Sequence, residues 1–382
     1  MRSFTSQPRP PAASPVPEAG MIDMTRTMPP NVDGFARYIQ EALSRVALLD
    51  DLEPLIKRHR FFGTETERTL VSEWLSKRLG FQPDIGSLNA TGGTQNALKI
   101  LLPRLVEPGR CVASETLSYA GTTVVCRLFG IPVVGVPIDD LGIIPDEFAT
   151  VCQRDRPAVL YCNPTIHNPT TSILPETRRR EIASIARRFS VTIIEDDVHG
   201  MIVPDAPPPI ASVAPDITWY IMSVSKCIGM GLRVAFLVAP DAPALAQLRA
   251  PVQSISAWFV PGLSMAVVAD LIRSGAADEI ARGVRQEVEA RQAIATRALE
   301  GHDFRSHRNA LHLWLALSEN WTAAKLSEAV RPFNVLVRPS DLFNTGEARM
   351  PNFVRLSLVA PKSRDDLQYA MEMIANQLSN SL

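Results

Sequence analysis

Residues 193–200 read Ile-Ile-Glu-Asp-Asp-Val-His-Gly, and this stretch decides the fold class of the chain. It continues the apolar run Val191–Glu195, whose β-branched residues are typical of a strand buried on both faces. Three carboxylates end the run, and a histidine follows three positions after the first aspartate. A buried carboxylate is costly unless a cation pairs with it. The stretch therefore predicts a core strand that delivers Asp196 and His199 to a functional site.

Five further apolar runs repeat this strand pattern, and helical segments lie between several of them. The strand-like runs are Cys111–Ser114, Val133–Val136, Ala158–Tyr161, Trp219–Met222 and Val234–Val238. The helical segments are Thr94–Leu105, Thr122–Leu128, Asp146–Cys152 and Pro175–Arg188, the last with proline in its first turn. This alternation predicts an α/β fold in which helices cover both faces of a mostly parallel sheet.

The two ends of the chain follow other patterns. Residues 1–21 are rich in proline, serine and alanine, which predicts a disordered tail. An N-terminal arm with helices is expected over 22–75, beginning with a helix near Asp33–Leu48. A second helix, Thr64–Gly80, starts at a capping box formed by Thr64 and Glu67.

After about Pro261 long helices precede short strands, which predicts a smaller α+β domain. The helices are Ser264–Ser274 and Asp278–Leu299, the strands lie near Leu311–Leu317, Val335–Arg338 and Phe353–Leu358, and a final helix ends the chain. We therefore expect a large domain over 76–261 and a small C-terminal domain over 262–382.

The composition argues against several classes of protein. The 382 residues are 46% hydrophobic and 21% charged, with a net charge of −1, which gives no electrostatic reason to bind nucleic acid. No apolar run reaches the roughly 18–20 residues of a membrane helix. Five scattered cysteines form no Cys-x-x-Cys pair, so neither a metal site nor a disulfide framework is indicated. We expect a cytoplasmic protein that contains no metal.

Several unusual residues follow the apolar runs, where ligands gather in sheets of this kind. Lys226 lies in Ser-Val-Ser-Lys, directly after the run Trp219–Met222. Burial lowers the pKa of an amine, and a neutral amine can form an imine with a carbonyl group. For an isolated lysine the ordinary alternative is an ammonium group that reaches solvent.

Other segments offer anion-binding groups. Two glycines and a threonine in Asn89–Leu98 precede a helix, whose N-terminus is suited to phosphate. Ser223, Ser225 and Arg233 can add further donors. Two Asn-Pro pairs in Tyr161–Thr171 indicate turns, and an asparagine held by the next proline is a rigid hydrogen-bond donor. Arg355, in a short alternating strand, is either a surface arginine or a carboxylate clamp.

Together these residues resemble the fold-type I enzymes that use pyridoxal 5′-phosphate. Within that group the chain resembles the domain shared by class I/II aminotransferases and MocR-type regulators. The resemblance covers roughly residues 22–380 and rests on Ser-Val-Ser-Lys followed by Gly-Leu-Arg, and on Asn-Pro-Thr-Thr followed by Ile-Ile-Glu-Asp-Asp. It implies a pyridoxal phosphate cofactor, α-amino acid and 2-oxo acid substrates, and a homodimer with active sites near the interface.

The resemblance also implies a role for individual residues. Lys226 forms the internal aldimine and moves a proton between the substrate and the cofactor, and Asp196 pairs with the pyridine nitrogen. Asn168 donates to the phenolic oxygen, while Tyr119 stacks on the ring. Arg355 binds the substrate's α-carboxylate. The residues implied around the phosphate are Gly93, Thr94, Gln95, Ser223, Ser225 and Arg233.

Two positions depart from the family pattern. His199 stands where the family usually has a tyrosine that contacts the phenolic oxygen. Because histidine ordinarily titrates near neutral pH, we expect His199 to take over this contact and to change the ionisation of the imine. Arg58 aligns with a tyrosine that reaches the partner subunit's phosphate in relatives, and an arginine can serve the same purpose.

Three functions are compatible with these residues. The leading one is an aminotransferase. The first alternative is another pyridoxal phosphate enzyme, such as a lyase, decarboxylase, aldolase or oxidase of specialised metabolism, and the substitution at His199 favours it. The second is a ligand-sensing regulator domain. About 20 non-basic residues precede the region of resemblance, which argues against a DNA-binding module there.

Overall fold

A seven-stranded sheet forms the centre of the computed structural model, which describes residues 20–58, 61–252, 260–345 and 352–379. Its order is β2-β10-β9-β8-β7-β3-β4. The strands are β2 (Leu88–Thr91), β3 (Val112–Glu115), β4 (Val133–Val136), β7 (Val159–Cys162), β8 (Thr192–Asp196), β9 (Thr218–Ser223) and β10 (Ala235–Val238). All neighbours pair in parallel except β10, which is antiparallel to β9 and β2. The predicted α/β fold with a mostly parallel sheet is confirmed.

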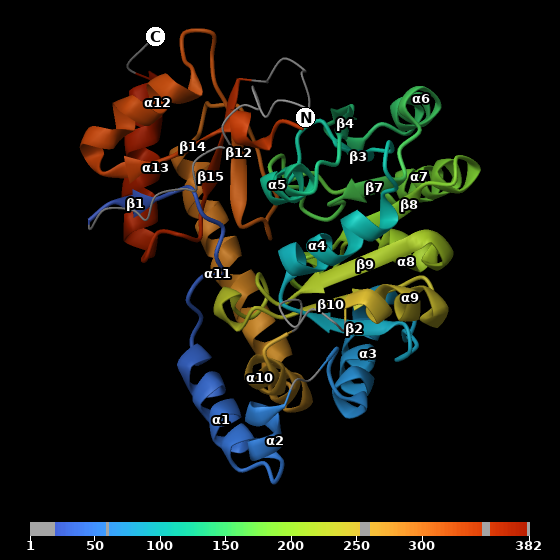
Figure 1. Ribbon diagram of the computed structural model, residues 1–382. Helices are drawn as coiled ribbons and strands as arrows, with labels where there is room; N and C mark the ends of the chain where they lie inside the picture. The colour runs from blue at the N-terminus through green and yellow to red at the C-terminus, as the bar shows by residue number, and fades with distance from the viewer. Residues whose placement is uncertain (1–19, 59–60, 253–259, 346–351, 380–382) are drawn as a thin grey trace, which may run out of the picture.

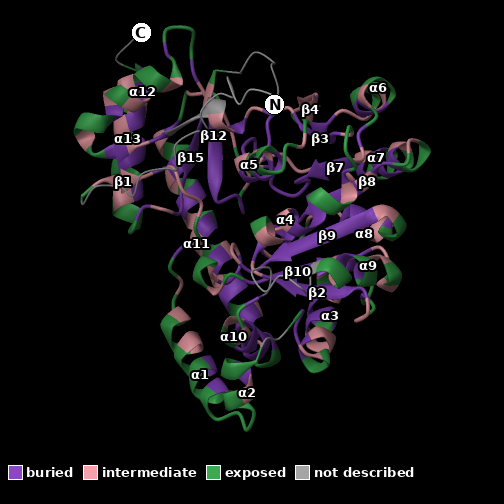
Figure 2. Ribbon diagram, in the orientation of Figure 1, coloured by how far each residue is buried: buried purple, intermediate pink, exposed green. Residues whose placement is uncertain are grey.

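Helices cover both faces of this sheet, so alternate residues of a strand pack into different layers (Figure 1). Tyr161 packs in the layer of α4 (Thr94–Leu105), α5 (Ala120–Leu128) and α9 (Ala242–Val252). Its neighbours Leu160 and Cys162 pack in the layer of α6 (Pro145–Asp155), α7 (Glu176–Arg188) and α8 (Ile210–Val213). Near β2, β9 and β10 this second face is covered by α3 (Glu65–Leu79) and α10 (Gly262–Arg273). The central strands are buried, as Figure 2 shows.

A second, antiparallel sheet follows later in the chain, in the order β11-β12-β15-β14. Its strands are β11 (Phe304–Arg305), β12 (His312–Ala316), β14 (Arg338–Pro339) and β15 (Phe353–Ser357). The helices that pack with it are α11 (Ala276–Ala298), α12 (Ala323–Val330) and α13 (Arg364–Ser379). Figure 1 shows α11 running from this sheet toward the seven-stranded one.

Short elements complete the described chain. The N-terminal strand β1 (Ile22–Asp23) pairs in parallel with β13 (Val335–Leu336) in a separate two-stranded sheet. The Ser357 N–H at the end of β15 donates to the carbonyl of Met24, which ties the start of the described chain to the second sheet. After β1, the helices α1 (Phe35–Ala47) and α2 (Leu52–Lys57) extend away from both sheets (Figure 1). A small hairpin joins β5 (Ile138–Asp139) to β6 (Gly142–Ile143).

Most predicted elements are present within a few residues of their expected bounds. The capping box is present, because the Thr64 side chain accepts from Glu67 N–H and the Glu67 carboxylate accepts from Thr64 N–H. Pro175 is the N-cap of α7, not a residue of its first turn. The strand expected over Val335–Arg338 is divided into β13 and β14.

The domain boundaries stay a prediction. The seven-stranded sheet uses residues 88–238 and the four-stranded sheet residues 304–357, on either side of the boundary proposed at 261. Residues 1–19 of the predicted disordered tail lie outside the described residues. Among the described residues, no helix combines the length and apolar character that a membrane crossing requires.

Candidate active site

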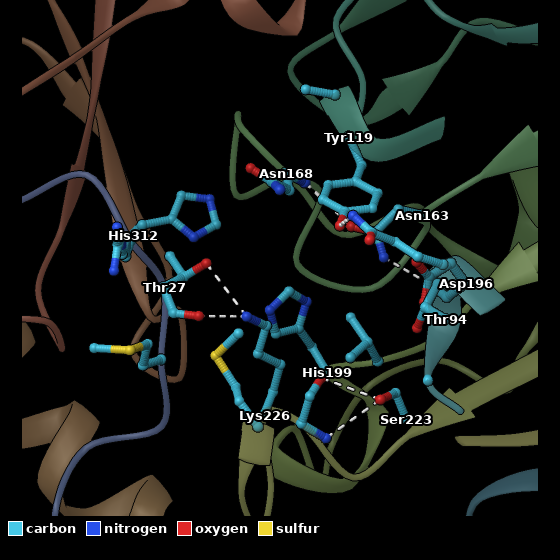
Figure 3. A pocket seen from close by; sticks show the side chains of 18 of the residues that line it. Thr27, Thr94, Tyr119, Asn163, Asn168, Asp196, His199, Ser223, Lys226 and His312 are labelled. Carbon is cyan, nitrogen blue, oxygen red and sulfur yellow. Dashed lines mark hydrogen bonds between the residues drawn. The ribbon is translucent and has the colours of Figure 1, made fainter. Parts of the chain in front are cut away.

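A cavity of about 460 Å³ lies at the ends of β7, β8 and β9, between the two sheets (Figure 3). Loops after parallel strands converge at this edge of a sheet. All twelve residues assigned to the site from the sequence line the cavity: Gly93, Thr94, Gln95, Tyr119, Asn168, Asp196, His199, Ser223, Ser225, Lys226, Arg233 and Arg355. The structure brings them together, and the role of each stays a prediction.

The amine of Lys226 reaches into the cavity from the turn after β9 (Figure 3). Its Nζ donates to the carbonyl of Thr27 and lies 3.4 Å from the Thr27 hydroxyl. Burial and, to a smaller extent, the charge of Arg355 lower the pKa of Lys226 to about 8, while Asp196 opposes the shift. An appreciable fraction of this amine is therefore neutral near physiological pH.

Asp196 ends β8 and is buried. Its Oδ2 accepts a hydrogen bond from the Tyr161 hydroxyl at 2.9 Å, whereas Oδ1 has no partner among the described residues. Burial raises the pKa of Asp196 to about 7, and the Tyr161 hydrogen bond opposes this shift. A buried carboxylate oxygen without a partner is suited to a cationic N–H group of a ligand.

The carboxylates on either side of Asp196 point away from the cavity and are satisfied elsewhere. Glu195 accepts from the backbone N–H groups of Ile210 and Ala211 at 2.9 and 2.8 Å. Asp197 forms a buried ion pair with Arg78, with Nε and Oδ2 2.8 Å apart. Neither Glu195 nor Asp197 lines the cavity, so Asp196 is the one of the three carboxylates that reaches it.

Arg355 enters the cavity from β15 of the second sheet. Its Nη1 donates to Asn168 Oδ1 at 2.8 Å, and its guanidinium carbon lies 4.9 Å from the centre of the Phe343 ring. Because the amide oxygen of Asn168 faces Arg355, the amide NH₂ is left as the donor on the other side. This arrangement supports the predicted donor role of Asn168.

The N-terminus of α4, Arg233 and two serine hydroxyls also line the cavity and can bind an anion. Gly93 is the N-cap of α4 with φ 98°, a conformation that L side chains rarely adopt. A Cβ at this position would lie 3.2 Å from Arg233 Nη2, so glycine lets the guanidinium approach the helix N-terminus. The Ser223 and Ser225 hydroxyls are 3.1 Å apart nearby. Helix N–H groups, an arginine and two hydroxyls together favour a phosphate.

Tyr119 is the N-cap of α5 and projects its ring into the cavity (Figure 3). Its hydroxyl accepts a hydrogen bond from Gln95 Nε2 at 2.9 Å, and burial raises the pKa of Tyr119. Gln95 therefore contacts Tyr119, and the ring of Tyr119 forms one wall of the cavity.

His199 is buried, and neither of its ring nitrogens has a partner among the described residues. Burial lowers the pKa of His199 to about 3, and the charge of Lys226 contributes. Burial therefore disfavours the imidazolium form, and the expected contact of His199 with the cofactor stays a prediction. Its unpartnered nitrogens remain available to a ligand.

Sequence reasoning missed several residues of the site. The segment Thr25–Met28 and the side chains Asn163, His312 and Phe343 also line the cavity. Asn163 belongs to the first of the two Asn-Pro pairs, so a signal for it was present. Its Nδ2 donates to the Asp196 carbonyl at 2.5 Å, and its Oδ1 accepts from Asn168 N–H at 3.1 Å. Arg58, which follows α2, does not line the cavity.

Pyridoxal 5′-phosphate, which the resemblance implied, fits these groups. The phosphate matches the N-terminus of α4 with Arg233, and the pyridine nitrogen matches the unpartnered Oδ1 of Asp196. The amine of Lys226 is available for the aldehyde. A cavity of about 460 Å³ falls in the range of small-molecule sites. The side chains present therefore suit this cofactor.

Comparison with known proteins gives consistent results. The family model described as aminotransferase class I and II matches residues 61–374. The 2-aminoadipate transaminase of Thermus thermophilus is 26% identical, over 72% of this chain and 70% of its own length. The uncharacterized HTH-type transcriptional regulator YdeF of Bacillus subtilis (strain 168) is 26% identical over 81% of this chain. The chain spans 66% of the length of YdeF.

Solved structures share the fold. LysN, the α-aminoadipate aminotransferase from Thermus thermophilus, superposes with a TM-score of 0.84 and 23% identity. The match covers 95% of this chain and 93% of LysN, which was solved in complex with N-(5′-phosphopyridoxyl)-L-leucine. At this identity the likeness establishes the fold.

Proposed function

The chain belongs to the aminotransferase class I and II family, and we propose that it is a pyridoxal 5′-phosphate-dependent aminotransferase. It would transfer an amino group from an α-amino acid to a 2-oxo acid. One observation carries the proposal: the cavity joins an amine of lowered pKa, Lys226, to a buried carboxylate with a free oxygen, Asp196. Arg355 lies on the same cavity and offers a carboxylate clamp.

The bound cofactor supplies a ring that accepts electrons and so stabilises negative charge at the substrate's α-carbon. The chain holds it at both ends. Arg233 and the N–H groups of α4 bind its phosphate, and Asp196 holds the proton of its ring nitrogen. Asn168 donates from its amide NH₂ to the phenolic oxygen. These contacts orient the ring within the cavity.

Arg355 and Lys226 act on the substrate. Arg355 binds the α-carboxylate, which orients the Cα–H bond toward Lys226 Nζ. Because burial lowers the pKa of Lys226 to about 8, its free amine can take the Cα proton near neutral pH. The ammonium form would then give this proton back at C4′ of the cofactor. Val198 and Met28 line the same cavity and help exclude water from this step.

The proposal includes a cytoplasmic homodimer. Support comes from apolar side chains exposed on α1, α2 and the loop between them: Leu43, Leu48, Leu49 and Ile56. Arg58 follows α2 and is the residue proposed to reach the partner's phosphate. The division into a large domain, 76–261, and a small one, 262–382, is part of the same proposal.

An amino-donor screen tests the function. The holoenzyme is mixed with single α-amino acids, and the absorbance of the bound cofactor is followed. The proposal requires conversion to the pyridoxamine form with at least one amino acid, and reversal by a 2-oxo acid. Lys226→Ala must lose this conversion. If the cofactor binds and no amino acid converts it, the chain is not an aminotransferase.

A second candidate is favoured by His199, which stands where the resemblance implies a tyrosine and whose two ring nitrogens have no partner among the described residues. In this case the enzyme would use the same cofactor for elimination, decarboxylation, aldol cleavage or oxidation. Release of ammonia, carbon dioxide or an aldehyde without the pyridoxamine form would identify it. Binding of an amino acid without any turnover would instead support a ligand-sensing regulator domain.

A further inference from the structure

Tyr161 is a buried tyrosine outside the cavity that contacts the site residue Asp196. It lies on β7 opposite Ile194 of β8, so Asp196 is two residues farther along on the same face of the sheet. The Tyr161 hydroxyl donates to Asp196 Oδ2 at 2.9 Å, and Tyr161 does not line the cavity. It therefore acts on a ligand only through Asp196.

The hydrogen bond affects the charge of Asp196. Burial raises the pKa of Asp196 to about 7, and among the influences that oppose this shift the Tyr161 hydrogen bond is the largest. Burial and Asp196 itself raise the pKa of Tyr161 far above its ordinary value, so its hydroxyl remains a donor. The other titratable groups that act on this carboxyl lie on or after four strands, β3, β7, β8 and β9: Tyr119, Cys162, Asp197 and Lys226.

The hydrogen bond also affects the direction of the carboxylate. Oδ2 is held by Tyr161, and Oδ1 is the oxygen left without a partner among the described residues. A donor on one oxygen limits rotation of the group about its last bond. The free oxygen then keeps one orientation while Asp196 lines the cavity.

We propose that Tyr161 is a positioning residue for the cofactor, which keeps Asp196 ionised and directs its free oxygen toward the ring nitrogen. The inference rests on the proposed function, because it assigns Asp196 to the pyridine nitrogen of pyridoxal 5′-phosphate. It adds a residue that does not line the cavity and is not among the twelve residues assigned to the site from the sequence.

The chain offers a matched control on the opposite face of β8. The Tyr220 hydroxyl of β9 donates to Asp197 Oδ2 at 3.0 Å, and both residues are buried. Asp197 is also held by Arg78, and neither Tyr220 nor Asp197 lines the cavity. Tyr220→Phe therefore removes the same kind of buried hydrogen bond without reaching the site.

The experiment compares wild type, Tyr161→Phe and Tyr220→Phe. Each protein is stripped of cofactor, and the dissociation constant of pyridoxal 5′-phosphate is measured between about pH 5.5 and pH 9, a range that brackets the titration of Asp196. In wild type, binding weakens as the pH falls below about 7, because Asp196 becomes protonated. Titrations of the phosphate and of Lys226 occur in all three proteins and cancel in the comparison.

Tyr161→Phe is expected to move the midpoint of this dependence upward by about one pH unit, since a hydrogen bond to an ionised group is lost. At about pH 7 the variant would bind the cofactor roughly fivefold more weakly, and near pH 9 the two would converge. Tyr220→Phe should keep the wild-type midpoint. A general loss of packing would weaken binding at every pH and leave the midpoint in place.

A double-mutant cycle completes the test. If Tyr161 acts through Asp196, then Tyr161→Phe adds no further loss of affinity in an Asp196→Asn background. Two results would overturn the inference while wild type still binds the cofactor. One is a Tyr161→Phe variant whose pH dependence of binding keeps the wild-type midpoint. The other is a double variant whose loss of affinity equals the sum of the losses in Tyr161→Phe and Asp196→Asn. Failure of wild type to bind pyridoxal 5′-phosphate would instead reject the proposed function.

Discussion

Arg355 Nη1 donates a hydrogen bond of 2.8 Å to Asn168 Oδ1, and this contact joins the second sheet to the loop after β7 of the central sheet. The amide of Asn168 is thereby oriented, and one end of the Arg355 guanidinium is fixed. The group that would bind a substrate carboxylate and the group that would contact the cofactor therefore share one hydrogen bond.

Arg355→Lys keeps the positive charge but removes the planar pair of donors. We expect the kcat/KM for an α-amino acid to fall about 100-fold, which corresponds to about 3 kcal/mol for a charged, hydrogen-bonded clamp. A primary amine that lacks a carboxylate serves as the control substrate. Its kcat/KM should change much less, and an equal loss for both substrates would contradict the clamp.

The amine of Lys226 gives a pH prediction. Covalent capture of pyridoxal 5′-phosphate requires the neutral amine, whose fraction rises as the pH increases through the pKa. Because that pKa is lowered from 10.5 to about 8, the rate of capture should reach half of its maximum near pH 8. Borohydride trapping and mass spectrometry measure the rate.

Two lysine variants control this measurement. Lys226→Ala should lose capture, whereas Lys77→Ala, at an exposed lysine of α3 paired with Asp278, should retain it. A half-maximum near the ordinary lysine value of about pH 10 would show that the amine of Lys226 is not desolvated as the structure indicates.

The buried pair of Arg78 and Asp197 gives a stability prediction. Arg78→Met would leave Asp197 without its cation in the interior, which costs about 3–5 kcal/mol of unfolding free energy. Arg282→Met breaks an exposed pair with Glu279 and should cost less than about 1 kcal/mol. Urea unfolding compares the two variants, and similar losses would refute the prediction.

His199 gives a spectroscopic prediction. Because burial lowers the pKa of its imidazole from 6.5 to about 3, no histidine step near pH 6.5 should appear in the absorbance titration of the bound cofactor. His199→Phe removes both ring nitrogens and should shift the titration midpoint, since a hydrogen bond to the cofactor is lost. His199→Tyr, which restores the residue that the resemblance implies, should give a third midpoint. Identical titration curves for wild type and both variants would exclude a contact between His199 and the cofactor.

Much of the fold and site was predictable because charged groups stand out at the ends of apolar runs. Asp196 and Lys226 are costly at such positions unless a ligand uses them, so their place in the sequence already indicated a site. The parallel strands were predictable for a different reason: a strand that is buried on both faces requires a continuous run of apolar residues.

Apart from Asn163, the features that were missed leave no such signal. Strand β2 is the short run Leu-Asn-Ala-Thr, whose asparagine and alanine have low strand preference. Tyr161 looks like any aromatic strand residue until its hydroxyl is seen to meet Asp196. The segment at Thr27 contacts the site through a main-chain carbonyl, which is the same for every side chain. The pKa of His199 depends on its surroundings, which its own identity does not reveal.

The pairing of β1 with β13 has a consequence for how the protein matures in the cell. Ile22 lies beside Val335, and Ser357 N–H donates to the carbonyl of Met24. The segment that supplies the carbonyl facing Lys226 is therefore synthesised long before the strands that hold it in place. Such distant contacts form late in folding. A nascent chain can thus complete its central sheet well before this wall of the cavity closes, so catalytic competence should arise only after β15 has left the ribosome.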